Sequence, residues 1–241
     1  MKSILLTLFI IPAFILTIFK SETSEPDNII VLELFTSQGC SSCPPADRIL
    51  NTVKSDNIIA LSYHVDYWNY IGWKDPFSKS TFTDKQRIYG SKFNSSTIYT
   101  PQLVVNGKEH VVGSNRRLVD QKINEYKRKA NTNSVKLSDA SKTDDVVNFK
   151  YNIEGSISNR YIRTILVIDE RKTSVKRGEN RNKELLNSNI VVSELRFQLE
   201  DVSGEGSIII PEIVEASDDL SLIVVIENDD LDITGASQVG L

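Results

Sequence analysis

The chain has few of the residues from which disulfide scaffolds and metal centres are built. It contains two cysteines, two histidines and one methionine among its 241 residues. Two cysteines can form only one disulfide, which excludes a small fold held together by several. Basic residues are not in excess either, since the net charge is −4. The chain therefore lacks the positive charge typical of proteins that bind nucleic acids, and we expect no such partner.

Long hydrophobic runs are also scarce, and the longest is at the N-terminus. Residues 4–19 are almost all apolar and follow Lys2. A positive start followed by an apolar run of this length is typical of a secretory signal peptide or signal anchor, which we assign to residues 1–20. A polar tether over residues 21–28 follows. We therefore expect an exported protein, periplasmic or secreted, that is either released or tethered to a membrane through residues 4–19.

The two cysteines stand together in one motif, Cys40-Ser-Ser-Cys43. The apolar run 29–35 precedes them and is typical of a strand buried on both faces. Two prolines begin at Pro44, and proline is tolerated in a helix only in its first turn. A helix is therefore predicted to begin at the cysteines. A second buried strand is predicted over residues 58–65, which gives a βαβ unit with parallel strands.

This placement favours redox chemistry at the cysteines. The free amides and the dipole of a helix start stabilise a thiolate, so Cys40 is the candidate nucleophile and Cys43 the residue that resolves a mixed disulfide. A static bridge across so short a loop would add little stability. We expect thiol–disulfide exchange with protein or small-molecule thiols and disulfides, without a cofactor.

Two other interpretations stay open at this point. The pair can be a static disulfide in a non-catalytic extracytoplasmic binding module. Alternatively, the two thiolates can bind copper or zinc together with His64 and His110, the two histidines of the chain, as in a metal chaperone. A lone histidine is more often a structural hydrogen-bonding residue, so we do not include either one as a metal ligand.

The middle of the chain contains an insertion rich in aromatic residues at about 66–90, which holds both tryptophans. Its rings can form a lid or a peptide-binding wall, or a satellite core under a long loop. A β-hairpin is predicted over residues 102–112, because Asn-Gly at its centre is a strong turn signal. Ser114 is the expected cap of the helix that follows.

The pattern changes after residues 131–134, where we expect a domain boundary. Short stretches of alternating or continuous apolar residues recur to the C-terminus, separated by turn residues. This pattern is typical of a β-sandwich. We therefore assign residues 29–132 to one domain and residues 133–241 to a second, sandwich-like domain.

The order of these elements resembles the thioredoxin fold. A strand, a Cys-x-x-Cys pair at a helix start, a second strand, a helix, and Thr100-Pro101 opening a hairpin all follow that family's order. In that family the Thr-Pro bond is cis, and its loop packs against the disulfide and receives the substrate. The resemblance implies that Thr100 and Pro101 bind the substrate.

A more specific resemblance covers nearly all of the chain expected to be exported. Residues 33–47, 64–68, 72–77 and 99–102 are similar to a family of secreted, thioredoxin-like proteins known as domain of unknown function 1223, and residues 177–181 and 234–236 extend the resemblance through the second domain. The resemblance implies a fold but no established reaction. The expected fold class is thus an α/β thioredoxin-like domain followed by an all-β, sandwich-like domain.

The chain departs from ordinary thioredoxins near the cysteines. Those proteins have a tryptophan before the first cysteine and a buried acid six residues before it, where this chain has Gly39 and Leu34. Glu33 should point to the opposite face of the sheet. A proton acceptor must come from elsewhere, and His64 and Asp66 at the end of the second strand are the candidates for a proton relay. Both can instead anchor the aromatic insertion.

Overall fold

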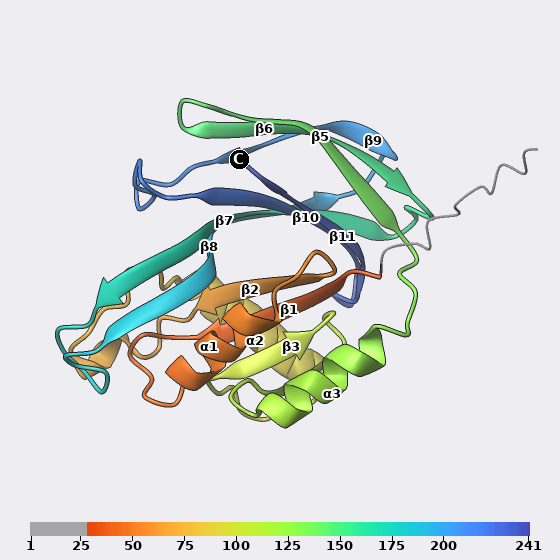
Figure 1. The fold of residues 1–241 in the computed structure, drawn as a ribbon. Coiled ribbons are helices and arrows are strands. Elements are labelled where there is room, and N and C mark those ends of the chain that lie inside the picture. The colour runs from red at the N-terminus through yellow and green to blue at the C-terminus, as the bar shows by residue number, and fades with distance from the viewer. Residues whose placement is uncertain (1–27) are drawn as a thin grey trace, which may run out of the picture.

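The computed structural model describes residues 28–241, in which one mixed sheet runs through both halves of the chain (Figure 1). Its eight strands lie in the order β11-β10-β7-β8-β2-β1-β3-β4, and a separate sheet has the order β5-β6-β9. The expected signal segment and most of the expected tether lie outside the described residues. Within residues 28–241, no helix is long and apolar enough to cross a membrane.

The described residues form eleven strands and three α-helices. In chain order they are β1 (Ile30–Thr36), α1 (Pro44–Val53), β2 (Ile58–His64), α2 (Ser80–Lys92), β3 (Gln102–Val105), β4 (Glu109–Val112), α3 (Arg116–Tyr126), β5 (Ser134–Thr143), β6 (Val146–Glu154), β7 (Arg160–Ser174), β8 (Glu184–Gln198), β9 (Ser203–Ile209), β10 (Leu220–Asn228) and β11 (Ile233–Gly240). A short 3-10 turn, Asn69–Ile71, lies within the aromatic stretch.

The N-terminal elements lie where the sequence predicted them. β1 and β2 pair in parallel and are buried along their whole length. α1 and α3 pack on one face of these strands through residues such as Leu50 and Ile123, and α2 packs on the other face through Phe82 and Tyr89. The cap of α3 differs from the prediction by one residue, because the side chain of Asn115 accepts the bond from Leu118 N at 3.2 Å.

The expected fold class, a thioredoxin-like α/β domain followed by a β-sandwich, is wrong. β7 and β8 form a hairpin of two 15-residue strands, and β8 pairs in parallel with β2 at Ile190 and Ser62. The C-terminal strands therefore extend the N-terminal sheet. Only β5, β6 and β9 form a second sheet, which packs over the C-terminal part of the large one. Apolar runs predicted the strands correctly but did not specify their partners.

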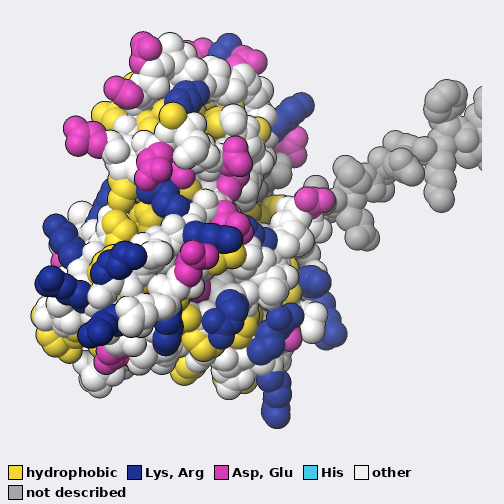
Figure 2. Space-filling view, turned by 60° about the vertical axis from the view of Figure 1, so that its left-hand side comes forward, with side chains coloured by type: hydrophobic (Ala, Val, Ile, Leu, Met, Phe, Trp, Pro, Cys, Tyr) yellow, Lys and Arg dark blue, Asp and Glu magenta, His cyan; other side chains and the backbone are white. Residues whose placement is uncertain are grey.

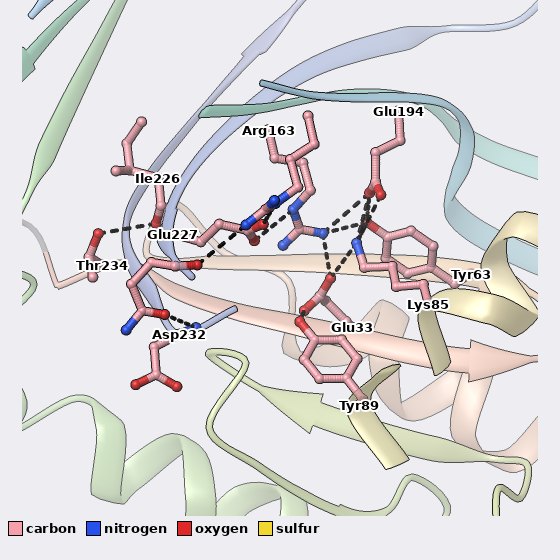
Figure 3. Close-up of polar contacts among 12 residues, drawn as sticks. Glu33, Tyr63, Lys85, Tyr89, Arg163, Glu194, Ile226, Glu227, Asp232 and Thr234 are labelled. Carbon is pink, nitrogen blue, oxygen red and sulfur yellow. Dashed lines mark hydrogen bonds and ion pairs between the residues drawn. The ribbon is translucent and has the colours of Figure 1, made fainter. Parts of the chain in front are cut away.

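A buried cluster of charges joins the two halves of the large sheet (Figure 3). Arg163 on β7 is 1% exposed, and its Nη1 lies 2.6 Å from Oε1 of Glu33 on β1. Its Nε lies 3.0 Å from Oε2 of the buried Glu227. Lys85 reaches Glu33 at 3.1 Å, and Tyr89 donates a hydrogen bond of 2.5 Å to it.

This cluster keeps Glu33 ionised inside the protein. Burial by itself raises the pKa of a carboxyl. The charges of Arg163 and Lys85 and the hydrogen bond from Tyr89 outweigh that effect and lower the pKa of Glu33 to about 2. As expected from strand alternation, Glu33 lies on the face opposite to Leu34, which packs with the residues of α1.

Removing the arginine should show how much the fold depends on it. We expect Arg163→Met to lower the free energy of unfolding by about 3–5 kcal/mol, because it leaves Glu33 and Glu227 as buried charges with too few partners. Arg87→Met is the matched control, since its pair with Asp84 is exposed and is worth less than about 1 kcal/mol. Urea denaturation measures both. Equal losses in the two variants would contradict a special role for the buried cluster.

Candidate functional site

The two cysteines lie in the loop between β1 and α1 and form a disulfide. Cys43 directly precedes the first residue of α1, so the helix begins at the cysteines as predicted. The backbone amides of Ala46 and Asp47 bond back to Cys43 O at 2.8 and 3.1 Å. Both cysteines are completely buried, while Ser41 and Ser42 between them are exposed. The bond is thus formed but closed to solvent.

The Thr100-Pro101 loop lies beside the disulfide. Its peptide bond is cis. The hydroxyl of Ser42 lies 3.5 Å from Thr100 O, and Sγ of Cys40 lies 3.9 Å from the same oxygen. Trp68 fixes the loop from the other side, because its Nε1 donates to Thr100 Oγ1 at 2.8 Å. The structure therefore brings Thr100 together with the cysteines, next to the aromatic stretch.

The aromatic stretch divides into a part that contacts the site and a part that does not. Trp73 Nε1 donates to the side chain of Gln38 at 3.2 Å. A Cβ at position 39 would lie 3.0 Å from Cβ of Trp68, so Trp68 packs closely on Gly39 and leaves little room for a side chain before Cys40. Phe77 belongs to the core under the three-stranded sheet, and Tyr70 is 82% exposed.

His64 and Asp66 play different roles from each other. His64 is fully buried, and its Nδ1 lies 2.7 Å from Oδ2 of Asp75, within the aromatic stretch. The same carboxylate oxygen accepts a 2.8 Å bond from Gln38 N, which precedes the cysteines. Burial alone would lower the pKa of His64, but the charge of Asp75 and the bond to it raise it. Asp66 instead accepts a 2.6 Å bond from Thr83 on α2 and so holds that helix.

A buried acid that the sequence analysis did not single out stands behind the disulfide. Asp47 lies on α1 four residues after Cys43, which places both on one face of the helix. Its Oδ1 accepts a 2.9 Å bond from the hydroxyl of Thr36. Burial raises the pKa of Asp47 to about 7, although the nearby His64 opposes the shift. The signal was present in the sequence, because Asp47 interrupts the apolar face formed by Ala46 and Leu50.

The tip of the β7–β8 hairpin, residues 175–183, reaches the cysteine loop from the other half of the chain. The side-chain amide of Asn180 is buried and donates to Gln38 O and Cys40 O, both at 2.9 Å. Ser41 N donates to the carboxylate of Glu179 at 3.0 Å. Gly178 has a φ of +73° and lies against Ile71. These contacts hold the hairpin tip on the loop that carries the disulfide.

The two cysteines and two histidines of the alternative metal interpretation do not come together in the described part of the chain. Within residues 28–241, no three His, Cys, Asp or Glu side chains gather in a group able to hold a metal ion. His110, the second histidine, bonds to the hydroxyl of Tyr99 at 2.9 Å and packs on Phe93. The two histidines therefore serve separate parts of the fold.

A large cavity lies at the far end of the sheet from the cysteines. Its volume is about 880 Å³, and it is open to solvent. Its lining includes Ile29 before β1, Lys54 and Asp56 before β2, and residues 236–238 of β11. The cysteines follow the opposite end of β1. We therefore base the candidate site on the disulfide and not on the size of the cavity.

Comparisons with known proteins give one family that matches this chain and two solved structures of similar fold. Residues 31–227 match a family described as "Protein of unknown function (DUF1223)". Protein AGR_C_4864 from Agrobacterium tumefaciens is similar in structure with a TM-score of 0.68 and 27% identity, covering 89% of this chain and 95% of its own. HBP35 of Porphyromonas gingivalis has a TM-score of 0.62 at 14% identity, covering 88% and 75%, and shares the fold. No curated protein matches this chain.

The hairpin contacts predict how fast the disulfide can be reduced. We expect Asn180→Ala to accelerate reduction of the Cys40–Cys43 bond by dithiothreitol several-fold, because it removes both side-chain bonds that hold the tip on the cysteine loop. Thiol release over time measures the rate. Ser174→Ala is the control, since this exposed residue ends β7 before the tip. An unchanged rate in Asn180→Ala would show that the hairpin does not limit access.

Proposed function

This chain belongs to the family described as "Protein of unknown function (DUF1223)", and we propose that it is an exported thiol–disulfide oxidoreductase that works through Cys40 and Cys43. One observation carries the proposal. A disulfide at the first turn of α1 is backed, one turn further on, by a buried carboxyl whose pKa is raised to about 7. A group that titrates near neutral pH can both give and take the proton that exchange requires.

The proposed reaction proceeds in two exchange steps. The thiolate of a partner attacks Sγ of Cys40, the Cys40–Cys43 bond breaks, and a mixed disulfide forms while Cys43 leaves as a thiolate. A second partner thiolate attacks the mixed disulfide, so two partner thiols are oxidised to a disulfide and Cys40 and Cys43 are reduced. The reverse sequence oxidises the pair. The positive end of the α1 dipole stabilises the thiolates in both directions.

Asp47 and His64 are the groups we assign to the proton transfer. Protonated Asp47 gives a proton to the thiolate of Cys43 when the disulfide opens and takes it back when the bond forms. His64 Nε2 is buried without a hydrogen-bond partner among the described residues, while Nδ1 is held by Asp75. We propose that the charge of His64, which acts to lower the pKa of Asp47, helps to set the pH at which Asp47 gives and takes this proton.

Substrate binding is proposed at the Thr100-Pro101 loop, in the manner of thioredoxin-like proteins. The likeness concerns the site and not the fold: a Cys-x-x-Cys disulfide at a helix start lies against the Thr100-Pro101 loop. Export follows from the signal-like residues 1–20 and fits this chemistry, because periplasmic and extracellular compartments are oxidising.

A static disulfide in a non-catalytic binding module is the second candidate, and the complete burial of both cysteines favours it. The reduction potential decides between the two. For an oxidoreductase we expect a value above about −300 mV in glutathione or dithiothreitol redox buffers, within the range of about −270 to −120 mV that such enzymes span. A potential below about −300 mV would identify a structural bridge and refute exchange as the function.

The pH dependence of reduction tests the role of Asp47. We measure the rate at which a neutral thiol reduces the protein disulfide and the rate at which the same thiol reduces a model disulfide. Dividing the first rate by the second removes the effect of the thiol's own titration. The quotient should be constant below pH 7 and fall above it, because Asp47 loses its proton there. In Asp47→Asn the fall should disappear and the rate at pH 6 should drop about tenfold or more.

Asp84→Asn, which removes an exposed carboxylate from α2, is the charge-matched control and should behave as the unaltered protein does. If Asp47→Asn keeps both the rate and the fall near pH 7, Asp47 takes no part in proton transfer.

A further inference from the structure

The hairpin tip that covers the disulfide is strongly basic. Residues 175–183 read Val-Lys-Arg-Gly-Glu-Asn-Arg-Asn-Lys, and Glu179 is the single acid among them. All four basic side chains are exposed: Lys176, Arg177, Arg181 and Lys183. The basic tip, as we call residues 175–183, thus carries a net charge of +3 on a chain whose net charge is −4.

Very little in the surrounding structure neutralises this charge. Among the described residues, Lys176, Arg177 and Arg181 take part in no ion pair, whereas Arg171 and Lys172 earlier on β7 do pair with acids. The carboxylate of Glu179 is already bound to Ser41 N, beside Cys40. Positive charge on the basic tip is therefore free to act on a molecule that approaches the disulfide.

Basic residues in neighbouring segments add to this positive charge. Lys74 is exposed and follows Trp73, which bonds to Gln38, and Arg48 is exposed next to Asp47. Figure 2 shows dark blue Lys and Arg side chains gathered on the lower part of the molecule, while many of the magenta acidic side chains lie on the upper part. The overall negative charge is thus distributed unevenly over the surface.

The basic tip both covers the disulfide and carries the positive charge. Asn180 at the centre of the basic tip bonds to the backbone of Gln38 and Cys40, and Lys183 Nζ holds the Asn180 side chain through a 2.9 Å bond to its Oδ1. Arg177 and Arg181 flank Asn180 along the chain and make no side-chain bond in the described part of the protein. They can therefore bind a partner without first breaking the contacts that close the site.

We propose that the substrate of this site is anionic, a thiol or disulfide with carboxylates close to its sulfur, and that the basic tip selects it. This inference rests on the proposed function, since it names the substrate class of the same disulfide. Carboxylates near the attacking sulfur are drawn to Arg177 and Arg181, which raises their local concentration at Cys40. Guanidinium groups suit this role because they bind carboxylates in two-point geometry.

Two phosphine reductants test the charge selectivity independently of the redox potential. Tris(2-carboxyethyl)phosphine is anionic at neutral pH and tris(3-hydroxypropyl)phosphine is neutral, and both cleave disulfides irreversibly as water converts the phosphine to its oxide. At low ionic strength we measure the rate of disulfide cleavage by the anionic phosphine divided by the rate of cleavage by the neutral phosphine. The ratio should fall about threefold to tenfold in the double variant Arg177→Gln/Arg181→Gln, and also in the unaltered protein at high salt.

The matched control is Lys127→Gln/Arg128→Gln, which removes two exposed positive charges after α3. It should leave the ratio unchanged. Equal ratios in all three proteins, or an equal fall in the control, would overturn the proposal. Because phosphine cleavage does not depend on the potential of the pair, this result stays separate from the test of exchange itself.

A pair of cysteine peptides distinguishes the two sources of such a substrate. One peptide has glutamates on both sides of its cysteine and the other has glutamines. Faster reduction of the disulfide by the acidic peptide, lost in Arg177→Gln/Arg181→Gln, identifies an acidic protein segment as the substrate. Selectivity for the anionic phosphine alone identifies a small anionic thiol. Either result supports an anionic substrate. No selectivity for the acidic peptide and none for the anionic phosphine would refute it.

Discussion

The buried ion pair between Arg163 and Glu33 is the constraint on which the rest of the structure depends. β1 comes from the N-terminal half of the chain and β7 from the C-terminal half, yet these two side chains meet 2.6 Å apart in the interior. Neither charge is tolerable there alone. The pair therefore requires both halves to fold onto one another, and the continuous sheet β7-β8-β2-β1 is the arrangement that allows it.

Two buried carboxyls in this protein have pKa values that are shifted in opposite directions. Glu33 is surrounded by Arg163, Lys85 and Tyr89 and stays ionised, so it serves the fold. The charges of His64 and Arg48 and the hydroxyl of Thr36 offset the burial of Asp47 only in part, and its pKa rises to about 7. Incomplete compensation makes Asp47 suitable for moving protons, and full compensation makes Glu33 unsuitable for it.

Local chemistry explains which parts of the structure the sequence could predict. The prolines after Cys43 fix the start of α1, and the Asn-Gly turn fixes the β3–β4 hairpin, because each acts within a few residues. The pairing of β8 with β2 depends on residues more than a hundred positions apart, and an apolar run does not specify a partner. The prediction of a separate β-sandwich was wrong for this reason.

The difference between local and long-range contacts also explains which residues of the site the sequence did not predict. Asn180 and Glu179 lie in a polar turn with no local feature that points to the cysteines, and only the long β7–β8 hairpin brings them there. Arg163 did leave a signal, since an arginine inside the apolar run 161–168 needs a buried acid, and Glu33 is such an acid inside the apolar run 29–35.

The contact between Asn180 and the backbone of Cys40 has a consequence for how such a chain can change over evolutionary time. The residues that hold the hairpin tip over the disulfide are encoded some 140 positions after it. Recombination that replaced one half of the gene would separate the cysteines from the turn that shields them, and Glu33 from its counter-ion. The two halves are therefore expected to be inherited together, and substitutions at their contacts to be accepted in pairs.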